Sequence, residues 1–138
     1  MVVYLVLQYN KTKVAVVKYN IFNHLYRLIK IVSYIIILLG IIHVSFAFPL
    51  HMNVDTLWFV GAGMAIIFAG LLNLIANERS SSKIAKPIAI VVNALTCALF
   101  CFALVILNEP QVYIGIILFL IATGAFILQL TSLKSLKP

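Results

Sequence analysis

The chain has 138 residues, of which 64% are hydrophobic and only 9% are charged, and its mean hydropathy is +1.18. Soluble globular domains are about half apolar, so this composition excludes that class and indicates a protein solvated by lipid. The formal net charge of +7 does not indicate nucleic acid, because the basic residues lie beside apolar runs and form no stripe with interleaved aromatic residues.

Residues 1–28 are expected to form a cytoplasmic N-terminal arm and a lead-in through the headgroup region. Residues 1–20 alternate short β-branched runs with lysines and asparagines, and this pattern leaves their structure open. Residues 21–30 carry apolar side chains at roughly helical spacing, as in a helix that enters a membrane. The first apolar stretch is short and precedes the lysines, so we expect no cleavable signal peptide.

Four later segments are each long and apolar enough to cross a bilayer, which requires about 20 apolar residues. Connectors with turn-forming composition separate them, including the serine-rich NERSSSKIAK and the turn Asn-Glu-Pro. The sequence therefore predicts an all-α, four-transmembrane-helix bundle: one polytopic membrane domain at residues 29–132, followed by a cytoplasmic tail at 133–138. The predicted spans cover residues 29–48, 57–76, 87–107 and 112–130.

All ten lysines and arginines fall on one side of this arrangement. They lie before the first span, between the second and third spans, and after the fourth span. Because Lys- and Arg-rich connectors stay in the cytoplasm, we expect both termini and the middle connector there, facing anionic lipids. The short loops and this charge bias suit the plasma (inner) membrane of a bacterium.

His43 is the only ionisable side chain well inside the first predicted span. An ionisable group within a membrane is by default a functional candidate, as a proton relay, a metal ligand or a substrate contact. The alternative is a neutral imidazole that hydrogen-bonds a neighbouring helix. No acidic residue or cysteine lies near it in the sequence, which favours the structural alternative.

Asn73 and Asn93 fall at similar depths in two antiparallel spans and are expected to pair. They are candidates either for a polar lining of a solute path or for an interhelical contact worth about 1 kcal/mol, and we favour the contact. Gln129 is expected near the membrane surface, where water or headgroups can satisfy its amide.

Small residues recur every four positions on two spans, which allows another backbone to approach closely. Gly63 and Gly70 broaden the first of these surfaces. The two cysteines are interpreted as small packing residues, because burial in an apolar span disfavours the reactive thiolate. The predicted helix-packing stripe consists of Gly61, Ala65, Ala69 and Asn73 on the second span, with Ala89, Asn93, Cys97 and Cys101 on the third.

The stretch LWFVGAGMAIIFAGLLNLIAN, with a histidine late in the first span, resembles the central segment of small bacterial four-helix integral membrane proteins that are uncharacterised. The resemblance covers the first two spans. It implies the same membrane architecture and no activity or site.

Two classes of function fit these observations. The first is a non-enzymatic accessory or structural membrane component that associates with itself or with another membrane protein through the small-residue stripes. The second is a small oligomeric transporter or channel with a polar path near His43, Asn73 and Asn93. We expect no enzyme, because the spans supply no clustered acid, base and nucleophile, and we expect no metal or cofactor.

Overall fold

The computed structural model describes residues 2–49 and 53–134, and these residues form four α-helices. Each helix contains a segment that is long and apolar enough to cross a membrane. The prediction of an all-α four-transmembrane-helix bundle is confirmed, and the chain is a multi-pass membrane protein. The helices are α1 (Val2–Ser45), α2 (Val54–Asn77), α3 (Ala85–Ile106) and α4 (Pro110–Lys134).

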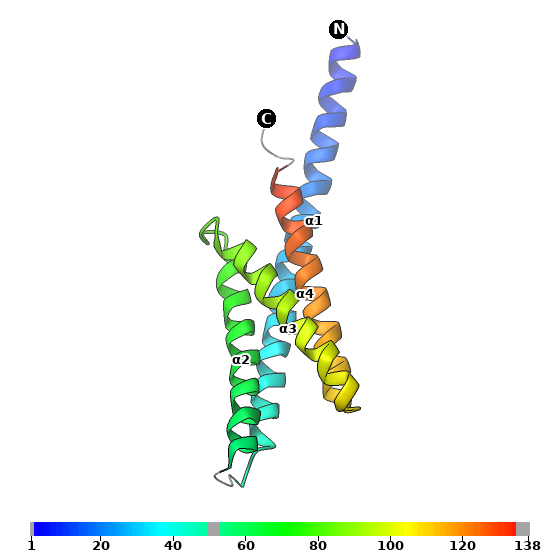
Figure 1. Cartoon of the computed structure of the whole chain (residues 1–138). Coiled ribbons are helices and arrows are strands. Elements are labelled where there is room, and N and C mark those ends of the chain that lie inside the picture. The colour runs from blue at the N-terminus through cyan, green and yellow to red at the C-terminus, as the bar shows by residue number, and fades with distance from the viewer. Residues whose placement is uncertain (1, 50–52, 135–138) are drawn as a thin grey trace.

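α1 has 44 residues and is much longer than its predicted span. The apolar segment within it begins at Tyr19, so the N-terminal arm, whose structure the sequence left open, is helical and continuous with the span. In Figure 1 the blue part of α1 extends beyond the ends of the other helices. The first span was predicted to reach residue 48, but α1 ends at Ser45. There the N–H groups of Ala47 and Phe48 donate to carbonyls three residues back, at 3.0 and 3.2 Å, just before Pro49.

The other helices begin at residues suited to a helix N-terminus. The Asn53 side chain caps α2, because its Oδ1 accepts the N–H of Thr56 at 2.7 Å. Pro87 lies in the first turn of α3 and Pro110 is the first residue of α4, where a missing N–H costs little. α4 continues to Lys134, past the predicted limit at residue 130, and the rest of the predicted tail, residues 135–138, lies outside the described residues.

Each helix packs against two others: α1 and α3 each contact both α2 and α4. The α1–α2 contact is the most extensive, and the α2–α3 contact is the smallest of the four. Figure 1 shows α2 and α3 close together near their connection and spread apart toward their other ends. We call the end of the bundle with the start of α1, the end of α4 and the α2–α3 connection the basic end, because Lys30, Arg79 and Lys83 belong to it.

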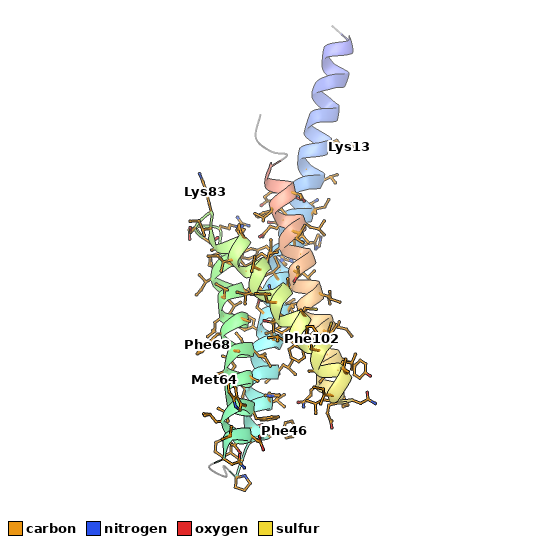
Figure 2. All side chains as sticks on the ribbon, viewed as in Figure 1. Lys13, Phe46, Met64, Phe68, Lys83 and Phe102 are labelled. Atoms are coloured by element: carbon orange, nitrogen blue, oxygen red, sulfur yellow. The ribbon has the colours of Figure 1, made fainter. Side chains whose placement is uncertain are left out.

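The interior contains two clusters of buried apolar side chains. One fills the middle of the bundle and includes Ile36, Ala69 and Phe119; the other lies toward the basic end and includes Ile29, Ala89 and Phe126. Most large apolar side chains point outward instead, among them Phe46, Phe68 and Phe102 (Figure 2). This inversion of the soluble pattern fits a bundle in lipid, which is held together by close packing and interhelical hydrogen bonds.

Candidate functional site

Asn73 of α2 and Asn93 of α3 form a reciprocal amide pair. Both side chains are completely buried. The Nδ2 of Asn73 donates to the Oδ1 of Asn93 at 2.9 Å, and the Nδ2 of Asn93 donates to the Oδ1 of Asn73 at 2.8 Å. The expected pairing is therefore present. Because each amide donates one hydrogen bond to the other and accepts one from it, with both side chains buried, the geometry favours an interhelical contact over the lining of a solute path.

A second amide contact lies one turn closer to the basic end, and the sequence analysis did not identify it. The Nδ2 of Asn77 donates to the carbonyl of Tyr26 on α1 at 2.9 Å, and the Nε2 of Gln129 on α4 donates to the Oδ1 of Asn77 at 3.3 Å. Gln129 was expected near the membrane surface, but its side chain is fully buried and its Oε1 has no hydrogen-bond partner among the described residues. The position of Asn77, four residues after Asn73, was the available signal.

The basic end joins the helices through cations that contact aromatic rings. The guanidinium of Arg79 lies 5.7 Å from the centre of the Tyr26 ring and donates to the Oδ1 of Asn23 at 3.2 Å. The ammonium of Lys86 on α3 lies 6.0 Å from the centre of the Phe22 ring, while most of its side chain is buried. Such cation–ring contacts tie the α2–α3 connection and α3 to the start of the apolar segment of α1.

His43 is partly buried near the opposite end of the bundle. Its ring stacks on Phe59 of α2, with centroids 4.0 Å apart and planes inclined by 15°. The side chain of Gln111 on α4 faces the imidazole, yet Nε2 is buried without a hydrogen-bond partner in the described part of the chain. The ring also adjoins Gly63, which precedes Asn73 by ten residues, or about 15 Å along α2. The structure therefore does not bring His43 together with the asparagine pair.

The two predicted small-residue stripes face each other in one half of the bundle only. Starting from the Asn73–Asn93 pair, a step of four residues along each antiparallel helix matches Ala69 with Cys97, and both are buried, at 2% and 8% exposure. The next step matches Ala65 with Cys101, and both are exposed. α2 and α3 therefore part between these two steps, in agreement with their divergence in Figure 1.

Gly61 continues the exposed part of the stripe. A methyl group built on its Cα would meet no atom within 4 Å. Its counterpart at the next step on α3, Val105, is 85% exposed. Gly61, Ala65 and Cys101, which we call the open stripe, are thus exposed in the part of the chain that the structure describes.

A different set of glycines, Gly40, Gly63 and Gly70, lies where the backbones of α1 and α2 approach each other closely. A methyl group on Gly40 of α1 would lie 2.9 Å from the carbonyl oxygen of Gly63 on α2, and one on Gly70 would lie 3.0 Å from the carbonyl oxygen of Ser33 on α1. Gly63 and Gly70 were expected only to broaden the stripe, whereas they form the principal α1–α2 contact. The signal was their spacing of seven residues, which places both on one face of a helix.

Cys97 and Cys101 are both free thiols. Cys97 is buried, and its Sγ lies 3.8 Å from the carbonyl oxygen of Ile116 on α4, which fits a packing role. Within residues 2–49 and 53–134, no three His, Cys, Asp or Glu side chains gather where they could share a metal ion.

These features define a polytopic helical membrane protein whose polar side chains mainly connect its own helices. Comparison of the chain with protein-family models, with curated proteins and with solved structures finds no match.

Proposed function

We propose that this protein is a non-enzymatic accessory or structural component of a membrane, and that its open stripe binds a transmembrane helix of another polypeptide. One observation carries the proposal: Gly61, Ala65 and Cys101 continue two small-residue stripes whose other halves pack together, yet they are exposed in the single chain. Small side chains in lipid favour helix association because they let two backbones approach closely.

The interior polar groups support this assignment over one that requires a solute path. The four amides of the two buried contacts join α1, α2, α3 and α4 through hydrogen bonds to each other and to one carbonyl. Such a network holds the bundle in one arrangement, as a scaffold for a partner requires. An enzyme would need an acid, a base and a nucleophile in one site. The proposed role needs no such site, since it depends only on helix association.

The proposal is tested by adding bulk to the open stripe. Gly61→Leu and Ala65→Leu should abolish co-purification of the partner, or of a second copy, because leucine prevents the close approach of backbones. Ala62→Leu is the matched control, since Ala62 is also exposed on α2 at the same depth but lies outside the stripe. Native mass spectrometry of the protein extracted with its own lipids measures the change. Unchanged assembly of both stripe variants would contradict the proposal.

We further propose that the protein resides in a bacterial plasma membrane with both termini in the cytoplasm. The placement of the basic residues at one end of the bundle supports this orientation. A fluorescent protein fused to the C-terminus should then fluoresce and an alkaline phosphatase fused there should be inactive. The reverse result would overturn the orientation.

A small oligomeric transporter or channel is the second candidate, and the observation in its favour is that the buried Nε2 of His43 has no hydrogen-bond partner among the described residues. An imidazole nitrogen without a partner can bind a proton or a polar solute. If the protein carries a flux, His43→Ala should remove the pH dependence of that flux. An unchanged pH profile would exclude the histidine from the mechanism.

A further inference from the structure

A groove of about 270 Å³ lies between α1 and α2 at the basic end, and Asn77 of the second amide contact forms part of its wall. Tyr26, Lys30 and Tyr34 of α1 line one side of it. They follow each other at steps of four residues and so share one face of the helix. Ile75 of α2 and Glu78, the residue that follows α2, line the other side.

The groove is polar toward one end and apolar toward the other. Lys30 and Glu78 lie toward the basic end, whereas Tyr34 and Ile75 lie deeper in the membrane segments and are 54% and 63% exposed on the lipid-facing surface. A surface with this polarity at the limit of a membrane span matches the headgroup and the upper acyl chain of a phospholipid, rather than a free anion.

The two charged groups of the groove are both available to a ligand. Lys30 and Glu78 are exposed, and no ion pair within 4.0 Å joins them in the described part of the chain. The nearby Arg79 is already engaged with Asn23 and with the ring of Tyr26, so Lys30 is the cation that faces the groove.

The ammonium of Lys30 and the carboxylate of Glu78 determine which phospholipid headgroup fits the groove. A phosphate diester accepts hydrogen bonds from an ammonium and from tyrosine hydroxyls, and a primary ammonium donates hydrogen bonds to a carboxylate. A glycerol headgroup offers no cation for Glu78. A choline headgroup carries a cation without an N–H donor. A phosphate that is followed closely by a primary amine can hydrogen-bond both charged groups, and an ethanolamine headgroup does so without the further carboxylate of a serine headgroup, which Glu78 would repel.

We propose that this groove binds one phospholipid with a phosphoethanolamine headgroup, with the phosphate at Lys30 and the ammonium at Glu78. Tyr26, one turn before Lys30, provides a hydroxyl donor beside the phosphate, and Tyr34, one turn deeper, provides ring surface to the acyl chain. One acyl chain continues over Ile75 along the lipid-facing side of α2.

Native mass spectrometry of the full chain, purified into detergent micelles mixed with equal amounts of phosphatidylethanolamine, phosphatidylcholine and phosphatidylglycerol, tests the proposal. The wild type should retain one phosphatidylethanolamine in preference to the other two lipids. Glu78→Gln should reduce that preference by about three- to tenfold and bring retention of phosphatidylethanolamine to that of phosphatidylcholine. Lys30→Gln should reduce retention of all three lipids.

Lys83→Gln is the control, because Lys83 is an exposed cation at the same end that does not line the groove, and this variant should retain lipid as the wild type does. Circular dichroism confirms that each variant is folded, which these exposed positions should allow. Equal retention of the three lipids by the wild type, preferential retention of phosphatidylglycerol, or an equal loss in the Lys83 and Lys30 variants would overturn the proposal. These outcomes are independent of the open stripe, which lies toward the other end of α2.

Discussion

Each amide of the Asn73–Asn93 pair satisfies the other in a place that water does not reach. Replacing one asparagine with valine leaves a buried amide without a partner and should lower the free energy of unfolding by about 1–2 kcal/mol. Replacing both should cost less than the sum of the single changes, with a coupling of about 1 kcal/mol. Equilibrium unfolding in mixed micelles measures the double-mutant cycle, and strictly additive losses would show that the amides do not interact.

His43 stacks on Phe59, so two substitutions can separate the contribution of ring packing to stability from that of the imidazole nitrogens. His43→Phe should preserve the ring contact and lose only the polar interactions of the imidazole with Gln111 and the Phe59 backbone, so it should be more stable than the alanine variant. His43→Ala should lower the free energy of unfolding by about 1–3 kcal/mol through the lost stack and the cavity left behind. The same unfolding assay compares the two variants. A phenylalanine variant as unstable as the alanine variant would show that the imidazole nitrogens hold the fold.

At the scale of single residues, the sequence predicted the asparagine pair. The number of residues from the end of a span fixes the depth of each asparagine, and antiparallel spans bring residues of equal depth together. It did not predict the burial of Gln129 or its contact with Asn77. Depth alone would place Gln129 near water, and its burial depends on the rotation of α4 toward α1 and α2. That rotation is set by the contacts of α4 with its neighbouring helices, and the sequence pattern of α4 alone does not determine those contacts.

The contact between α1 and α2 depends on backbones that approach each other at glycine. Gly40→Ala places a methyl group 2.9 Å from a carbonyl oxygen, and the helices must separate to accept it. We expect a loss of about 1–3 kcal/mol in the free energy of unfolding. Gly61→Ala is the control, because its methyl group meets open space, and its stability should equal or slightly exceed that of the wild type. Equal stability of the two variants would mean that the helices are not in close contact at Gly40.

At the scale of the helices, the sequence predicted the number of spans, but the apolar segment of α1 begins at Tyr19, ten residues before the start predicted for the first span. Apolar length, the prolines near the starts of α3 and α4, and the serine-rich connector all indicate the number of spans. The choice of contact face was harder. The stripe of Gly61 and Ala65 has the denser spacing of small residues, yet Gly63 and Gly70 pack against α1. The difference arises because several faces of α2 carry small residues, and only the crossing of the helices decides which is used.

At the scale of the whole molecule, α2 and α3 diverge away from their connection. Cross-linking can test this by showing which residue pairs on the two helices are close together. With Cys101 replaced by serine, Ala69→Cys should link to the native Cys97 through a short bifunctional thiol reagent, because both positions are buried where the helices meet. With Cys97 replaced by serine, Ala65→Cys should not link to the native Cys101 within one chain, since the helices have parted there. Electrophoresis of dilute protein separates links within a chain from links between chains. An efficient intrachain link at the second pair would show that the open stripe is closed.

The length of α1 has a mechanical consequence. Residues 2–18 precede the apolar segment and continue the same helix, so they form a rod of roughly 25 Å beyond the start of the span at 1.5 Å per residue. No loop separates this rod from the membrane-embedded half, so a change in the tilt of the embedded half is transmitted to the projecting half as a larger sideways displacement of its tip. The contacts of Arg79 with Tyr26 and of Lys86 with Phe22 lie at the base of this rod, so the projecting residues extend from the point where α1 is held by the α2–α3 connection and α3.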